Sequence, residues 1–164
     1  MTELDNIWSR MLADAVAKAG DAGRRDVAEY LRLKAANDTI RTAGVEWLFD
    51  TIIEIAMRDY PVAAVERKEP HSFDRGNFTM VGSLLSIRQG VRCLTLEAGW
   101  ARVPSDGIMQ KGALAYARLS HFGMPKKGAE IRLVHVASLP QWLDEDGSVI
   151  DISGLRRHLD ILFS

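Results

Sequence analysis

Residues 78–103, FTMVGSLLSIRQGVRCLTLEAGWARV, are the main evidence in the sequence for a β-sheet. They are rich in Val, Ile, Leu, Thr and aromatic side chains, which favour strands. Gln89-Gly90 interrupts them near the middle, so two strands, 78–88 and 91–103, joined by a tight turn are expected. Upstream, Tyr60-Pro61 separates this part of the chain from a helical one, because proline disfavours helical geometry in the residue before it.

Three helices are predicted before Pro61. In the first, apolar residues recur every three or four positions from Leu4 to Ala19, and Gly20 ends the helix. A second helix is expected over about 22–36 and a third over about 38–59. The third is apolar around so much of its circumference that it is expected to pack on two sides, between the other helices and a sheet.

Beyond Pro61 the pattern indicates a mainly antiparallel sheet. Short strands are expected at 62–68 and 130–136, and a hairpin at 141–152 that turns around residues 144–147, before a terminal helix that begins at Ser153. Residues 106–122 fit either a helix or another antiparallel strand. We favour the helix, because Ala113, Ala115 and Ala117 are poor strand formers and Gly123 would end it.

The predicted fold is therefore α+β, with three N-terminal helices packed on a mainly antiparallel sheet. One helix is inserted between strands, and a short helix ends the chain. A chain of 164 residues is expected to form a single domain, with a helical layer at 1–60, a sheet-containing part at 61–152 and the terminal helix at 153–164.

Composition predicts a soluble, cytoplasmic protein. Hydrophobic residues make up 47% and charged residues 26% of the chain, which suffices for a core and shows no disorder bias. Cys93 is the only cysteine, so no internal disulfide can form, and a buried thiol is expected. The N-terminus lacks the pattern of a secretory signal, and no apolar run approaches the length needed to cross a membrane.

The positive charge is concentrated in the middle of the chain. Residues 61–138 carry 11 Lys or Arg and 6 Asp or Glu, whereas residues 1–60 carry 8 and 11, and residues 139–164 carry 2 and 5. Such segregation can create a basic face, or the acidic flanks can fold across it. The first hypothesis for function is therefore a non-catalytic binding or regulatory protein that meets a nucleic acid or an acidic protein. Its candidate binding residues are Arg88, Arg92, Arg102 and Arg118.

The candidate catalytic residues are Glu97, Asp74, His71 and His121. Glu97 follows an apolar run, and a carboxylate is costly to bury unless it is paired or protonated. It is either an acid-base group or metal ligand, or a structural residue that pairs with an arginine or faces water. His71 and Asp74 lie in a stretch expected to be irregular, where they could share a metal or simply turn the chain. His121 would either move protons or stabilise the end of the helix expected at 106–122.

The predicted order of helix, three strands, helix and strand resembles the core of the restriction-endonuclease-like nucleases. Those enzymes hold magnesium with an Asp and a Glu-x-Lys on consecutive strands, and Glu97 falls where that glutamate would be. Glu97-Ala98-Gly99 lacks the lysine, and the preceding strand offers no aspartate. The second hypothesis for function is a small metal-dependent phosphoester hydrolase, in which Glu97 and Asp74 hold a metal and His71 or His121 moves protons. The resemblance gives this hypothesis another form, a degenerate nuclease of this kind. Binding is the first hypothesis because no catalytic spacing is complete, and the sequence requires no cofactor. A homo-oligomer formed through the apolar helices is compatible with either.

Overall fold

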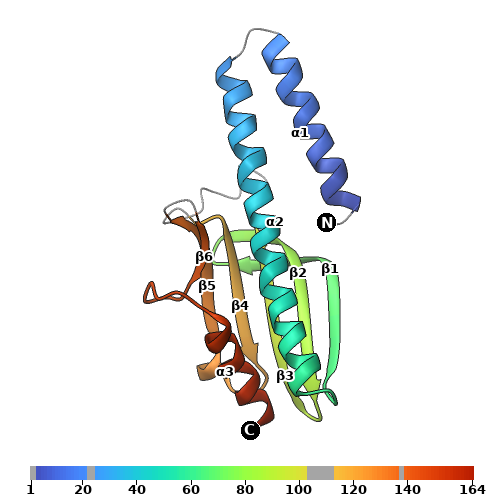
Figure 1. Ribbon diagram of the computed structural model, residues 1–164, viewed down its shortest axis with the longest axis vertical. Helices are drawn as coiled ribbons and strands as arrows, with labels where there is room; N and C mark the ends of the chain where they lie inside the picture. The colour runs from blue at the N-terminus through green and yellow to red at the C-terminus, as the bar shows by residue number, and fades with distance from the viewer. Residues whose placement is uncertain (1–2, 22–24, 103–112, 137–138) are drawn as a thin grey trace. The chain divides into compact units, whose positions relative to one another are not determined.

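The computed structural model describes residues 3–21, 25–102, 113–136 and 139–164 (Figure 1). The chain divides into two compact units, Met1–Ala43 and Gly44–Ser164. The first unit contains α1 (Glu3–Asp21) and the first part of α2 (Arg25–Asp59). The second contains the rest of α2, then β1 (Ala64–Arg75), β2 (Phe78–Gln89), β3 (Arg92–Trp100), β4 (Ala115–His121), the short 3-10 helix η3 (Pro125–Lys127), β5 (Ala129–Val136), β6 (Leu139–Leu143) and α3 (Ile152–Phe163).

The six strands form one antiparallel sheet in the order β1-β2-β3-β4-β5-β6, so each strand pairs with its neighbour along the chain. The predicted hairpin within residues 78–103 is confirmed, because Gln89 pairs with Arg92 across the turn. Gly90 has φ of 61° there, a left-handed conformation that favours glycine.

One face of the sheet carries the core of the second unit. Figure 1 shows the second part of α2 and α3 on this face, which we call the covered face. Phe49 and Ile52 of α2 are buried, as are Leu155 and Leu159 of α3. The strands supply Leu85, Ile87, Leu94, Leu96, Leu119, Ile131 and Leu133 to the same layer.

We call the other side of the sheet the open face, because no described helix of the second unit covers it. Residues directly paired across antiparallel strands point to the same face, so the strand pairing defines its rows. From the middle of the sheet towards the Gly90 turn, the rows are His71–Gly82–Gly99–Tyr116–Arg132, Lys68–Leu84–Glu97–Arg118–Glu130 and Glu66–Ser86–Thr95–Ser120.

The predicted α+β class and the C-terminal helix are confirmed. Among the described residues before Pro61 there are two helices rather than the three expected, because α2 continues through residues 36–38, where a break was expected. Asp38 does not start a new helix. Its carboxylate instead accepts hydrogen bonds from Trp8 Nε1 at 3.1 Å and Arg41 Nη1 at 2.7 Å, so a tertiary contact replaces the cap. The expectation of one folding domain stays a prediction.

The prediction of a helix over 106–122 is wrong for Ala115–His121, which forms β4. Residues 103–112 lie outside the described part of the chain. In β4, Ala115, Ala117 and Leu119 are buried on the covered face. Arg118 and Ser120 point to the open face and are only half-buried. Small side chains let the strand approach the helical layer, and this packing outweighs their low strand propensity.

Strand β1 is longer than expected and runs through His71 and Asp74, so these residues do not lie in an irregular stretch. The pairing with β2 shifts register between Lys68 and His71, around Pro70. Pro70 cannot donate to a strand ladder, and the edge position of β1 tolerates it.

No helix in the described residues is both long and apolar enough to span a membrane.

Candidate functional site

The open face brings together an alternating chain of charged side chains, which we call the charge network. His71 Nε2 lies 3.0 Å from Glu97 Oε1, and Arg118 Nη1 lies 3.5 Å from Glu97 Oε2. Arg118 Nε lies 3.4 Å from Glu130 Oε1, and Arg75 Nε lies 3.6 Å from Glu130 Oε2. Three residues predicted from the sequence for different reasons, His71, Glu97 and Arg118, therefore belong to one cluster.

The strand register explains the charge network. Glu97 pairs with Arg118, and Arg118 pairs with Glu130, so these side chains are direct neighbours across three strands. The Glu97 side chain is 21% exposed, and its two oxygens each have a cationic or imidazole partner. Glu97 is therefore paired with an arginine, as one of its two interpretations from the sequence expected, and also with His71.

Two paired glycines form the floor of the open face next to the charge network. A Cβ on Gly82 would lie 1.9 Å from the carbonyl oxygen of Ala98, and one on Gly99 would lie 2.4 Å from that of Val81. No side chain fits at either position without a movement of the strands. Bare backbone therefore separates His71 on one side of this row from Tyr116 on the other.

The open face ends in an apolar cluster on one side and in exposed cations on the other. The cluster contains the buried side chains of Phe73, Met80 and Tyr116, and the Arg75 guanidinium lies 3.9 Å from the centre of the Tyr116 ring. This contact joins the charge network to the apolar cluster.

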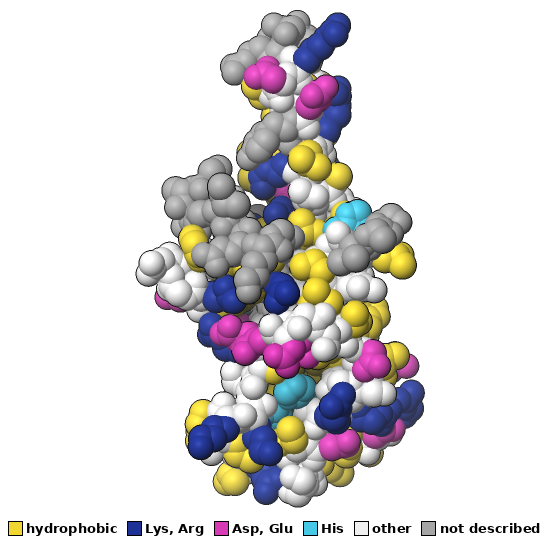
Figure 2. All heavy atoms as spheres, turned by 90° about the vertical axis from the view of Figure 1, so that its left-hand side faces the viewer, with side chains coloured by type: hydrophobic (Ala, Val, Ile, Leu, Met, Phe, Trp, Pro, Cys, Tyr) yellow, Lys and Arg dark blue, Asp and Glu magenta, His cyan; other side chains and the backbone are white. Residues whose placement is uncertain are grey.

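At the opposite end, Arg88 pairs with Cys93, and the backbone amide of Phe122 donates to the carbonyl of Cys93 at 2.9 Å. Arg88 is exposed, and the Phe122 side chain is 72% exposed. Lys126 and Lys127 follow in η3, within the turn between β4 and β5. These residues and Val91 of the hairpin turn are all exposed. We call them the basic edge: Arg88, Val91, Phe122, Lys126 and Lys127. Figure 2 shows Lys and Arg side chains beside hydrophobic ones at the lower end of the sheet-containing unit.

The cations of the basic edge differ from Arg92, Arg102 and Arg118, the other arginines expected to bind a partner, in their contacts within the described residues. Within the described residues, the side chains of Arg88, Lys126 and Lys127 form no hydrogen bond or ion pair. Arg92 instead donates from Nη1 to the carbonyl oxygens of Ser164 and Ile161 at the end of α3. The guanidinium of Arg102 lies 4.1 Å from the centre of the Trp100 ring.

The structure does not bring Asp74 to Glu97. The Asp74 carboxylate accepts a hydrogen bond from Thr79 Oγ1 at 3.1 Å, and alternation along β1 directs it to the side of the sheet opposite His71. Only its backbone carbonyl reaches the charge network, where it accepts from Arg118 Nη2 at 3.1 Å. Among the described residues, no three His, Cys, Asp or Glu side chains are placed to hold a metal ion.

His121 lies on the covered face, apart from the charge network. It is 4% exposed, and its Nε2 lies 2.9 Å from Nδ1 of His158 on α3. Burial lowers the pKa of His121, and burial together with the charges of His121 and Arg157 lowers the pKa of His158 to about 4. The sequence signal that could have placed His158 beside the sheet is its helical spacing, three residues after the buried Leu155 and four before the buried Leu162 of the amphipathic terminal helix.

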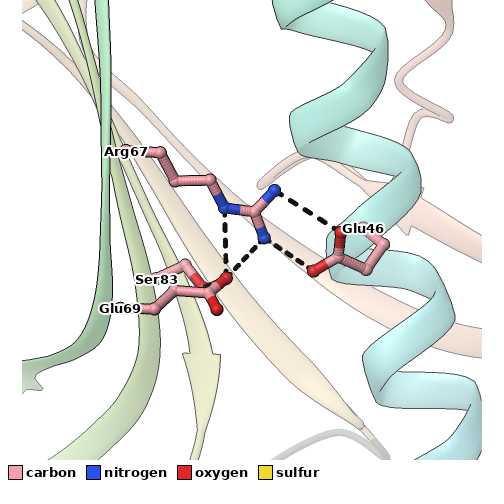
Figure 3. A network of polar contacts seen from close by, with 4 residues as sticks. All are labelled: Glu46, Arg67, Glu69 and Ser83. Atoms are coloured by element: carbon pink, nitrogen blue, oxygen red, sulfur yellow. Dashed lines mark hydrogen bonds and ion pairs between the residues drawn. The ribbon is translucent and has the colours of Figure 1, made fainter. Parts of the chain in front are cut away.

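A second polar network lies on the covered face, between α2 and the edge of the sheet (Figure 3). Arg67 Nη2 lies 2.6 Å from Glu46 Oε1 on α2 and 2.5 Å from Glu69 Oε1 on β1. Ser83 Oγ donates to the same oxygen of Glu69 at 2.5 Å. Burial alone would lower the pKa of Arg67, but the hydrogen bonds to the two glutamates raise it above its usual value. Sequence reasoning missed this network and also missed Glu130, because both depend on which strand lies beside which.

Comparisons of the chain with protein-family models, with curated proteins and with solved structures find no match.

Proposed function

We propose that the protein is a non-catalytic binding domain that holds a single-stranded nucleic acid at the basic edge of its open face. The observation that carries the proposal is the exposed ring of Phe122 beside cations that have no partner among the residues that the structure describes. Proteins that bind single strands combine such cations, which contact phosphates, with aromatic rings on which bases stack. An acidic protein would use the cations but would leave Phe122 without a role.

The neighbouring row of the open face supports the same partner. Ser86, Thr95 and Ser120 lie next to the basic edge and are half-buried, so their hydroxyl groups can bond phosphate, sugar or base atoms. The charge network beyond them is internally balanced, so it adds no strong field of either sign. The affinity therefore depends on few phosphate contacts.

The test is fluorescence anisotropy with labelled single-stranded RNA and DNA of mixed sequence. Three cations at the edge predict a slope of about −2 for the logarithm of affinity against the logarithm of salt concentration, since each neutralised phosphate of a single strand contributes about −0.7. We expect Arg88→Met and Phe122→Ala each to weaken binding by about fivefold or more, since stacking of one base contributes about 1–3 kcal/mol.

Lys18→Met is the matched control, because Lys18 is an exposed cation on α1 and its loss should leave the affinity unchanged. Absence of binding to either oligonucleotide at low salt would contradict the proposal. So would binding of a poly-glutamate peptide in their place, which would assign the edge to an acidic protein.

The metal-dependent hydrolase has less support. It needs the carboxylates of Asp74 and Glu97 to converge on one ion. Alternation along β1 directs the Asp74 carboxylate to the side of the sheet opposite His71, whereas the Glu97 carboxylate on β3 lies beside His71.

A further inference from the structure

The first unit is a helical hairpin with very little core of its own. Among its described side chains, Leu12 at 6% and Ala28 at 2% exposed are the buried apolar ones. The remaining buried side chain is Asp38, which bonds Trp8 and Arg41. Units of about 40 residues usually need a further stabilising contact, such as oligomerisation, in order to stay folded.

The outer side of α1 carries a stripe of exposed residues at heptad spacing. We call it the α1 stripe: Glu3, Ile7, Arg10, Asp14 and Ala17, which alternate in steps of four and three residues and are all exposed. Ile7 is 48% exposed, and Met11 beside it is 58% exposed. Steps of four and three place these side chains along one side of the helix, where they can face a single partner helix. Two of the five, Ile7 and Ala17, are apolar and the other three are charged, so charge pairing must contribute to such a contact.

The charges of the α1 stripe make it complementary to itself. Residues 1–43 carry seven Lys or Arg and seven Asp or Glu, so two copies of the hairpin do not repel each other through net charge. A two-fold axis at the level of residue 12 places Arg10 of each copy opposite Asp14 of the other, and Ile7 opposite Ala17. A two-fold interface requires this kind of self-complementary pattern. Within the described residues, neither Arg10 nor Asp14 has an ion-pair partner.

We propose that the α1 stripe is a dimer interface, on which the α1 stripe of a second copy of this chain lies antiparallel. The contact buries Ile7 and Met11 and forms two Arg10–Asp14 ion pairs. This inference is independent of the proposed function, because it involves no residue of the open face.

The test is sedimentation equilibrium of the full chain, with circular dichroism to show that each variant stays helical. We expect wild-type protein at about 50 μM to have twice the 18.2 kDa mass of the chain. This result requires a dissociation constant of the dimer below about 50 μM, which a modest interface can supply. Ile7→Glu should give monomers. Leu33→Glu is the matched control, because Leu33 is also exposed but lies on α2, and its variant should remain dimeric.

Charge exchange tests the antiparallel register itself. Arg10→Asp and Asp14→Arg should each be monomeric, since each variant places like charges opposite one another in its own dimer. An equimolar mixture of the two restores both pairings and should return to the dimer mass. If a variant were monomeric because the substitution destabilised its own helix, mixing the two variants would not restore the dimer.

A wild-type chain of monomer mass would overturn the proposal, including the case in which the second unit of the same chain covers the stripe. A mixture that stays monomeric would overturn the antiparallel register, and with it the proposed interface.

Discussion

At the residue scale, the pair formed by the buried His121 and the half-buried His158 makes the stability of the fold depend on pH. The two rings are stacked with centroids 5.3 Å apart, one on β4 and one on α3. The pKa of His158 falls to about 4 in the folded chain, mainly because burial disfavours its charged form. The two imidazoles therefore hold α3 to the sheet while both are neutral.

The sign of the pH dependence follows from this lowered pKa. The unfolded chain binds a proton at His158 near pH 6.5, whereas the folded chain does so only near pH 4. The free energy of unfolding is therefore at its full value above about pH 6.5 and falls as the pH drops towards 4. We expect urea midpoints to decrease over this range, and His158→Gln to reduce the decrease.

His135→Gln is the control, because His135 is exposed on β5 and its variant should keep the wild-type pH profile. A His158→Gln profile identical to that of the wild type would contradict the assignment of the pH dependence to His158.

The carboxylate of Asp59 affects stability at lower pH. Its hydrogen bond with Arg156 lowers its pKa below 3.8. Its contribution to the free energy of unfolding is therefore present above that pH and is lost as the pH falls through the lowered pKa.

Gly99 allows a second test at the residue scale. A Cβ there would lie 2.4 Å from a backbone oxygen of β2, so Gly99→Ala must displace a strand. Overpacking of this kind lowers the free energy of unfolding by about 1–3 kcal/mol, and backbone contact favours the upper end. Gly76→Ala is the comparison, since Gly76 has φ of 61° and no atom within 4 Å of its added Cβ. It should cost about 1 kcal/mol from backbone strain alone. Chemical denaturation measures the free energy of unfolding of both variants. An equal decrease for Gly99→Ala and Gly76→Ala would contradict the close approach of β2 and β3.

At the element scale, α2 and β1 are joined by the network of Glu46, Arg67, Glu69 and Ser83 (Figure 3). The Arg67 side chain is 26% exposed, and its guanidinium also lies 4.7 Å from the centre of the Phe49 ring. It therefore connects the helix to the edge strand by charge and by packing.

Arg67→Met should remove this connection and leave two glutamates close together without a cation. We expect the free energy of unfolding to fall by about 1–3 kcal/mol, the range for a charged hydrogen-bonding partner that is only partly buried. Arg58→Met is the control, because the Arg58 side chain is 57% exposed and its ion pair with Asp59 should contribute no more than about 1 kcal/mol. Thermal unfolding of a double-mutant cycle with Glu46→Gln measures the coupling, and additive effects would contradict a direct contact.

The helix α3 is attached by contacts that the sequence does not announce. Tyr60 stacks on Phe163 with ring centroids 3.8 Å apart, and its hydroxyl donates to Asp160 at 2.6 Å. Arg92 binds the last carbonyls of α3, where a cation also interacts favourably with the helix dipole. Two of the arginines expected to bind a partner thus have internal partners, since Arg118 belongs to the charge network and Arg92 to this cap.

At the scale of the whole molecule, the two compact units should differ in stability. The hairpin buries few apolar side chains, whereas the second unit has a core contributed by α2, the sheet and α3. Hydrogen exchange should therefore be faster for amides of α1 than for those of β3 by about tenfold or more, since local opening requires less free energy than global unfolding. Arg10→Asp removes the proposed pairing of Arg10 with Asp14 of a second copy, so it should accelerate amide exchange in α1 and leave exchange in β3 unchanged. Equal protection of α1 and β3 would contradict two separate units.

The α+β class, the Gly90 hairpin and the terminal helix can be predicted from the sequence, because hydrophobic period, turn residues and helix-stop signals are local properties of the chain. It also placed Glu97 and Arg118 among the residues of interest. Three features depend on tertiary packing and are seen only in the structure: β4 is a strand, α2 continues through Asp38, and Glu97 lies between His71 and Arg118 while Asp74 lies apart. Each of these depends on which element packs beside which, and that pairing is fixed by burial and register across distant parts of the chain.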